Sequence, residues 1–191
     1  MEITSQEKLL IKITKILSDL KIKYFITGGF AVSVWGRPRA TFDIDIIVKL
    51  IEPQAFPLAK ALREISKAGY ADENMIKDAI CYNGEFNFID PNSGLKVDFW
   101  VLKEKDSNPP ELKNRKLKKI SGQNVYFASP EDLILSKLQW YQETQSSRHL
   151  EDIRSILKIS GKKIDMKYIK RWAKKLEVLD ILNKIIEKDI R

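Results

Sequence analysis

Apolar and polar residues alternate with two different periods along the chain, which predicts a protein that mixes helices and strands. Near the N-terminus, Leu9, Ile13, Leu17 and Leu20 recur at helical spacing behind a capping-box sequence at 4–7. Elsewhere, apolar residues recur at every second position between turn residues, which predicts strands. The predicted strands cover residues 24–27, 41–48, 85–90 and 95–102, with a small hairpin at 118–120 and 125–127.

Helical spacing predicts a short helix at 30–35 and another at about 54–68, and it dominates from Ser129 onward. Ser129 is a strong N-cap because Pro130 follows it at the first helical position. The region 103–115 is charged, contains Pro109-Pro110 and is expected to be a linker or a peripheral excursion. The helices predicted after Ser129 cover residues 130–144, 147–159, 165–175 and 177–189.

This order of elements predicts an α+β fold. A short mixed β-sheet flanked by helices is expected in residues 1–105. A basic, mainly helical C-terminal part is expected in residues 106–191 and should pack on the sheet.

Composition places the chain among soluble globular proteins, with 43% hydrophobic and 31% charged residues. No apolar run approaches the ~20 residues that a membrane helix requires. The N-terminal residues lack a small-residue cleavage site, so we expect no signal peptide. Cys81 is the only cysteine. An internal disulfide is therefore excluded, and a reducing, cytoplasmic environment is expected.

The net charge of +8 lies entirely in the second half of the chain. Residues 1–100 hold 13 Lys/Arg and 13 Asp/Glu, whereas residues 101–191 hold 21 and 13. A basic half indicates a polyanionic partner such as RNA. A solvated lysine-rich surface explains the same excess without any partner.

Two aspartates lie inside the apolar run from Phe42 to Val48. Residues two apart on a strand point the same way, so Asp43 and Asp45 share one face. Phe42, Ile44 and Ile46 are expected to face the core. Like charges placed in this way repel, and a divalent cation is the usual remedy.

Asp98 is a third candidate, because it alternates with Val97 and Phe99 on a later strand. If that strand lies beside the one carrying Asp43 and Asp45, three carboxylates converge. Hard oxygen ligands without a nearby histidine or cysteine favour Mg²⁺ or Mn²⁺. Such a set can hold two metals ~3.5–4 Å apart for displacement at phosphorus. The alternative is a pair of solvated aspartates on an edge strand.

The residues upstream of these aspartates fit phosphate binding. Gly28-Gly29 ends a strand and opens a helix, where backbone N–H groups are available to phosphate oxygens. Arg37 and Arg39 precede the acidic strand and can donate charge-assisted hydrogen bonds to a triphosphate. An ordinary glycine turn and a solvated arginine loop are the alternatives.

Together these motifs resemble a known signature. Gly28-Gly29, thirteen residues, Asp43-Ile44-Asp45 and later Val97-Asp98-Phe99 are similar to the DNA polymerase beta-like nucleotidyltransferase superfamily. The run Arg39-x-Thr41-x-Asp43-Ile44-Asp45 is typical of its small bacterial members. The segments 129–138 and 148–153 resemble the abortive-infection (AbiEii-like) toxin branch, although His149 stands where that branch commonly has an acidic residue.

The resemblance implies a nucleotidyltransferase-type sheet and an enzyme of the EC 2.7.7 type, which moves a nucleoside monophosphate from an NTP to an acceptor. By similarity, Asp43, Asp45 and Asp98 are catalytic and bind the metal, Mg²⁺ or Mn²⁺. The implied nucleotide-binding residues are Gly28, Gly29, Arg39, Thr41 and Lys137.

The implied acceptor is tRNA or another RNA 3′ end, or a protein hydroxyl, in a toxin- or defence-related role with an antitoxin partner. Two alternatives are an antibiotic nucleotidyltransferase of the aminoglycoside or lincosamide type, and a nucleotide-binding module without catalysis. The alternative for Lys137 is a surface lysine that covers the edge of the core, and with the resemblance the phosphate role is preferred. Arg148 and Asp152 lie four apart on a predicted helix, where a surface ion pair explains them.

Overall fold

The computed structural model describes residues 4–65, 71–102 and 110–189, and it divides into two compact units. The sheet unit comprises residues 1–30, 40–103 and 115–127, and the helical unit comprises residues 31–39, 104–114 and 128–191. The division passes through the short helix α2 (Gly28–Trp35). The hairpin after residue 115 belongs to the sheet unit, although it lies beyond residue 105, where the sequence places the boundary.

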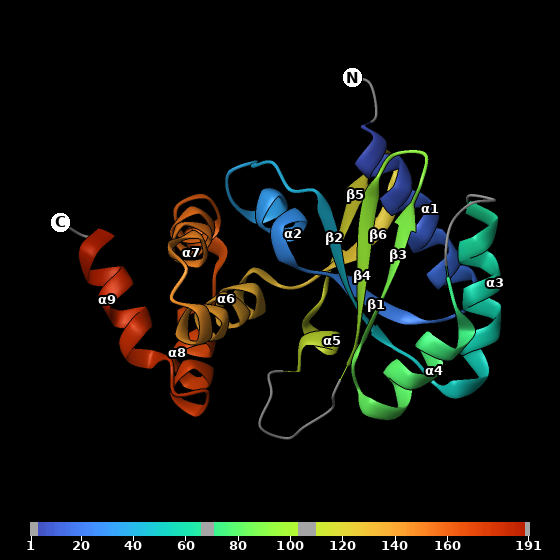
Figure 1. Cartoon of the computed structure of the whole chain (residues 1–191). Coiled ribbons are helices and arrows are strands. Elements are labelled where there is room, and N and C mark those ends of the chain that lie inside the picture. Colours follow the sequence, from blue (N-terminus) through green and yellow to red (C-terminus); the bar gives the residue numbers. More distant parts are fainter. Residues whose placement is uncertain (1–3, 66–70, 103–109, 190–191) are drawn as a thin grey trace. The chain divides into compact units, whose positions relative to one another are not determined.

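The sheet unit is built on one six-stranded mixed sheet (Figure 1), which confirms the predicted α+β class. The strand order is β3-β4-β2-β1-β6-β5. The neighbouring strands β2 and β4 run parallel, as do β1 and β6, and the other neighbours are antiparallel. The strand bounds are β1 Lys23–Ile26, β2 Asp43–Lys49, β3 Glu85–Asp90, β4 Leu95–Val101, β5 Lys116–Ile120 and β6 Gln123–Phe127.

Alternation along β2 and β4 separates a buried face of the sheet from a polar one. Ile44 and Ile46 on β2, and Val97 and Phe99 on β4, are fully buried. Three helices pack on the buried side: α1 (Ser5–Asp19), α3 (Ala55–Ile65) and α4 (Glu73–Tyr82), all on one side of the sheet in Figure 1. The carboxylates of β2 and β4 therefore lie on the opposite face, as a strand period of two requires.

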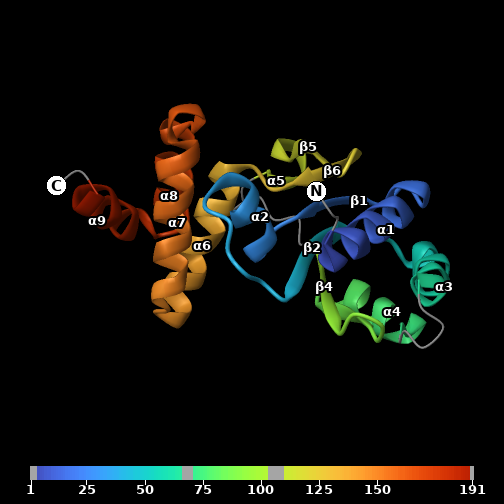
Figure 2. The ribbon, with the colours of Figure 1, turned by 90° about the horizontal axis from the view of Figure 1, so that it is seen from above.

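The helical unit is a small cluster of four long helices (Figures 1 and 2). They are α6 (Pro130–Thr144), α7 (Ser147–Ser160), α8 (Met166–Lys175) and α9 (Leu179–Asp189), preceded by the short α5 (Glu111–Asn114). Helix α6 packs on α7 and α8, and α9 packs on α7 and α8. The Ser129 side chain caps α6 by accepting from the Asp132 N–H, so this helix has the predicted start. Two short 3₁₀ turns, Glu52–Gln54 and Gly161–Lys163, complete the elements.

Two sequence predictions about local structure are wrong. Phe42 does not pack in the core: β2 begins at Asp43, and Phe42 stands before it with 79% of its surface exposed. Helix α4 was not predicted, because only Ile76 and Ala79 of its ten residues are buried and the apolar period is short. Residues 66–68 of the predicted 54–68 helix and 103–109 of the predicted linker lie outside the described residues.

None of the helices in the described part of the chain combines the length and the apolar character that crossing a membrane requires.

Candidate active site

The pairing of β2 with β4 brings two of the three predicted carboxylates into register. Asp45 on β2 is the Cα partner of Asp98 on β4, and Asp43 is the partner of Lys96. Adjacent strands lie about 4.7–4.9 Å apart, so Asp45 and Asp98 are direct neighbours on the polar face. Asp43 occupies the same face two residues before Asp45. The predicted neighbourhood of the two strands is thus confirmed.

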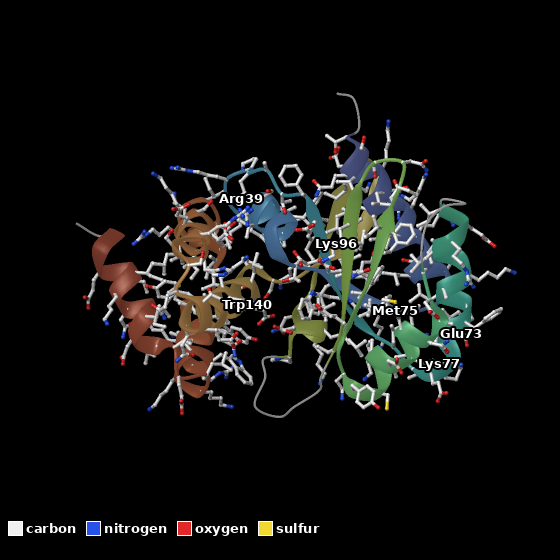
Figure 3. All side chains as sticks on the ribbon, in the orientation of Figure 1. Arg39, Glu73, Met75, Lys77, Lys96 and Trp140 are labelled. Carbon is white, nitrogen blue, oxygen red and sulfur yellow. The ribbon has the colours of Figure 1, made fainter. Side chains whose placement is uncertain are left out.

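Lys96 shares this polar face and forms an ion pair with Asp98 (Figure 3 labels Lys96). Its Nζ lies 2.8 Å from Asp98 Oδ1, and the Lys96 side chain is 43% exposed against 13% for Asp98. The hydrogen bond to Asp98 raises the pKa of Lys96, so the ammonium form is favoured. The carboxylate cluster therefore already holds one cationic group, supplied by the chain itself.

The donor set fits a hard divalent cation in its chemistry, since Asp43, Asp45 and Asp98 offer only carboxylate oxygens. In the described ranges, no three Asp, Glu, His or Cys side chains lie close enough together to hold one ion as they stand. The strand register places the backbone of the three aspartates on one face. Whether their carboxylate oxygens come within reach of one ion depends on the side-chain rotamers. The Lys96 ammonium pairs with Asp98 at this position.

Gly28 adjoins the same cluster and has no room for a side chain. Its φ is +61°, and an added Cβ would lie 1.8 Å from Asp45 Oδ2. Only glycine satisfies both the backbone angle and the close approach. The Thr27 N–H donates to the Asp45 carbonyl at 2.9 Å, which ties the end of β1 to β2 at this point. The start of α2, including Gly29, is thereby placed beside the Asp45 carboxylate.

In the helical unit, Asp152 binds two cations that the sequence singles out separately. Arg39 donates from Nε to Asp152 Oδ1 at 2.8 Å and from Nη2 to Oδ2 at 3.0 Å. Lys137 Nζ lies 3.1 Å from the same Oδ2. Asp152 is 3% exposed and Lys137 9%. The expected surface position of Asp152 is therefore wrong, because its carboxylate is buried beside Arg39 and Lys137.

The charges around Asp152 determine its ionisation. Burial by itself would raise the pKa of Asp152, but the Arg39 hydrogen bonds and the Lys137 charge outweigh it and lower that pKa. Asp152 is thus an anion that holds two cations in place. His149, one turn earlier on α7, has its pKa lowered by burial and by the Lys137 charge, and its ring stacks on Trp140. These contacts indicate that His149 has a structural role, in packing against Trp140.

The predicted nucleotide-binding residues fall into two sets. Gly28, Gly29 and Thr41 belong to the sheet unit, where the Thr41 hydroxyl lies 3.4 Å from the Asp43 carbonyl. Arg39 and Lys137 belong to the helical unit and meet at Asp152. Within the first set, Gly28 adjoins Asp45 and Thr41 contacts the Asp43 carbonyl. Within the second set, both cations are held by the Asp152 carboxylate.

Sequence reasoning did not identify two polar residues of the carboxylate cluster, Asn87 and Lys96. Asn87 on β3 is the Cα partner of Asp98 on its other side, which places an amide next to the carboxylates. The signal for Asn87 was the alternation of polar and apolar residues from Glu85 to Phe88. Lys96 precedes Asp98 by two residues, so the strand period alone places it on the same face. The sequence named Asp152 only for its spacing from Arg148, and it did not reveal the partners Arg39 and Lys137, because both are distant in sequence.

Comparison with solved structures identifies the fold of the chain. The antibiotic-resistance protein ANT(2″)-Ia, solved with adenylyl-2″-tobramycin, superposes with a TM-score of 0.64 at 16% identity, over 91% of this chain and 98% of its own. An antigenic nucleotidyltransferase-like protein of Paracoccidioides brasiliensis gives a TM-score of 0.61 at 21% identity, over 97% and 90%. The chain has a nucleotidyltransferase fold.

A Thermotoga maritima protein described as a candidate nucleotidyltransferase shares this fold, with a TM-score of 0.52 at 18% identity over 75% of this chain and 90% of its own. No protein-family model matches the sequence, and no curated protein matches it significantly. At these identities the likeness concerns the nucleotidyltransferase fold alone, and the AbiEii-like branch stays a prediction.

Proposed function

We propose that this protein is a metal-dependent nucleotidyltransferase, which moves a nucleoside monophosphate from an NTP to an acceptor hydroxyl and releases pyrophosphate. The observation that carries the proposal is the register of Asp45 with Asp98 on parallel neighbouring strands, with Asp43 on the same face. The nucleotidyltransferase fold is consistent with it but does not assign a reaction.

Asp43 and Asp45 would hold Mg²⁺ or Mn²⁺, with Asp98 completing the set. A bound divalent cation would neutralise charge that develops on the phosphoryl oxygens during in-line displacement. Asp98 would also accept the proton of the attacking hydroxyl, because a carboxylate at this position is both ionisable and adjacent to Asp45. The glycine at 28 would leave the backbone accessible to the nucleotide at the cluster.

In the sheet unit, Gly28, Gly29 and Thr41 are the residues that we propose for binding the triphosphate. In the helical unit, Arg39 and Lys137 are the proposed phosphate-binding residues. Arg39 and Lys137 supply charge-assisted hydrogen bonds, and Asp152 sets their positions in advance. Catalysis of phosphoryl transfer depends mainly on positioning and charge stabilisation, so side chains held before substrate arrives reduce the barrier.

The acceptor we favour is an RNA end such as that of tRNA, with a protein hydroxyl as the second choice. The basic second half of the chain is the supporting observation. By resemblance to the AbiEii-like branch, the activity would be toxic to the host cell and countered by an antitoxin. Growth arrest on induced expression, relieved by Asp45→Asn, would support that biological role.

The proposed reaction is tested by incubating the protein with each α-labelled NTP, Mg²⁺ or Mn²⁺, and either tRNA or cell protein. We expect label transfer that Asp45→Asn abolishes. Asp78→Asn, an exposed carboxylate on α4, is the matched control and should retain full transfer. Absence of transfer in every combination, with folded protein, contradicts the proposal. Tight NTP binding by calorimetry without any turnover would favour a binding module instead.

Antibiotic modification is a second candidate, because the structure of ANT(2″)-Ia with adenylyl-2″-tobramycin shares this fold. An aminoglycoside is cationic and would be attracted to an acidic surface. The excess of eight positive charges in residues 101–191 opposes that attraction. Measuring aminoglycoside and lincosamide resistance in an expressing strain separates the two candidates.

A further inference from the structure

The helical unit contains a large cavity that the predicted site residues only border. It has a volume of about 990 Å³ and lies between the loop after α2 and the helices α7, α8 and α9. This volume is at the upper end of the ~300–1,000 Å³ typical of ligand sites. All of its walls belong to the helical unit. The charged residues of the walls are Arg37, Arg39, Glu151, Asp152, Arg154 and Lys158.

The charge of these walls is positive. Four cations line the cavity against two carboxylates, and Asp152 is already bound by Arg39 and by Lys137. Arg37 and Lys158 are exposed, and in the described part of the chain neither side chain takes part in a salt bridge. Two cations are therefore available to an anionic ligand without breaking an internal ion pair.

The loop that carries Arg37 and Arg39 is fixed on α7. The Arg37 N–H donates to the Ser155 hydroxyl at 2.6 Å, and Arg39 binds Asp152 through two hydrogen bonds. A Cβ added to Gly36 would lie 2.5 Å from Ser155 Oγ, so the loop approaches the helix closely. Because the loop backbone is ordered in advance, binding an anion costs less conformational entropy here than on a free loop.

Between the charges, the cavity has an aliphatic surface formed by Pro38, Leu157, Met166 and Ile186. These residues are partly exposed, so a ligand would cover them. A nucleotide presents an apolar base next to an anionic phosphate, which matches this alternation. A cavity of about 990 Å³ has room for the end of a single strand.

Helix α8 extends the basic surface beyond the cavity. Met166, its first residue, lines the cavity, and five cations farther along the helix are exposed. They are Lys167, Lys170, Arg171, Lys174 and Lys175. A small anion would use only the cavity, whereas a longer anionic chain also interacts with the positive charge that these residues give to the surface of α8. The arrangement therefore favours a polyanionic chain over an isolated anion.

We infer that this cavity binds the end of a single-stranded RNA, with Arg37 and Lys158 contacting its phosphates and the aliphatic wall covering a base. This inference rests on the proposed function, in which RNA is the acceptor of the nucleoside monophosphate. Binding itself requires neither NTP nor metal, so it can be measured separately from transfer.

The test is fluorescence anisotropy with a short 5′-fluorescein-labelled single-stranded oligouridylate, in the absence of NTP and at several salt concentrations. The cavity variant is Arg37→Ala/Lys158→Ala. The matched control is Lys8→Ala/Lys12→Ala, which removes two exposed lysines of α1. Its net charge is the same as that of the cavity variant. Denaturant unfolding of all three proteins establishes that they fold equally.

We expect the cavity variant to lose about tenfold in affinity and to lower the salt slope by about 1.4, which corresponds to two lost phosphate contacts on a single strand. The control should stay within about twofold of wild type. Equal losses in both variants, or no binding by wild type, would overturn the inference.

The two proposals fail in different ways. Transfer of label to protein by a chain that binds no RNA would refute the cavity site and leave the nucleotidyltransferase proposal standing. Cavity-dependent RNA binding without label transfer to any acceptor would refute the reaction and leave the binding site standing.

Discussion

The Arg39 guanidinium binds both carboxylate oxygens of Asp152, which lies 113 positions later in the chain. Lys137 reaches the same carboxylate, so one buried anion orders two of the residues that are proposed to bind the triphosphate. This arrangement makes Asp152 a positioning residue for both cations.

Replacing Asp152 by alanine should lower the free energy of unfolding by about 3–5 kcal/mol, because it leaves the buried Lys137 without a counter-charge. Denaturant unfolding measures the loss. Glu151→Ala, an exposed carboxylate next in sequence, is the control and should cost under about 0.5 kcal/mol. A loss below about 1 kcal/mol for Asp152→Ala would mean that the ion pairs contribute little.

Gly28→Ala should both destabilise the protein and impair any activity at the carboxylate cluster. The positive φ costs roughly 1–2 kcal/mol, and the new Cβ would also displace the Asp45 carboxylate. Gly94→Ala is a matched control, because Gly94 has φ +69° but nothing within 4 Å of its added Cβ. Unfolding measurements should show a clearly larger loss at 28 than at 94. Equal losses would show that the Asp45 side chain moves aside freely.

Lys96→Met should strengthen binding of a divalent cation. The Lys96 ammonium occupies Asp98 Oδ1, so a metal must compete with it. An exposed ion pair is worth roughly 0.2–1 kcal/mol, which corresponds to a gain of up to about fivefold in Mn²⁺ affinity by calorimetry. Lys77→Met is the control, since Lys77 forms a comparable 2.7 Å pair with Glu73 on α4 (Figure 3). Weaker Mn²⁺ binding in Lys96→Met would argue that Asp98 is not a ligand.

Glu111→Gln should stabilise the protein at alkaline pH. Burial, and then the charge of Asp132, raise the pKa of Glu111 to about 7 from 4.5. Since the folded-state pKa lies above the unfolded one, the related stability is complete below pH 4.5 and is lost as pH rises through 7. Urea unfolding should show no difference near pH 4 and a gain of roughly 3 kcal/mol near pH 9.

Glu143→Gln, an exposed carboxylate on α6, controls for the change of net charge and should show no such pH dependence. If the free energies of unfolding of Glu111→Gln and wild type differ by the same amount at every pH, the Glu111 carboxylate is in solvent.

Much of the local structure follows from short-range rules. The N-cap at Ser129 and the proline after it place the start of α6, and alternation gives β3 its bounds from Glu85 to Asp90. The same period places Asp43 and Asp45 on one face. These predictions succeed because each depends on residues within one or two turns of chain. Helix α4 was missed, since two buried residues are too few to reveal a period.

Phe42 shows the limit of extrapolating such a period. Its place in the alternation predicts burial, but the strand begins one residue later and leaves the ring in solvent. The boundary of a strand depends on the partner strand, which the alternation does not describe.

What the sequence determined by itself is which residues share a face: the aspartates at 43 and 45, and the aspartate at 98 opposite its apolar neighbours. Only the tertiary structure decided that Asp45 pairs with Asp98, and that Asp152 binds Arg39 and Lys137. Faces follow from the repeat of a single strand or helix. Pairings between distant segments depend instead on which strands become neighbours and which charges are buried together, and no local pattern contains that information.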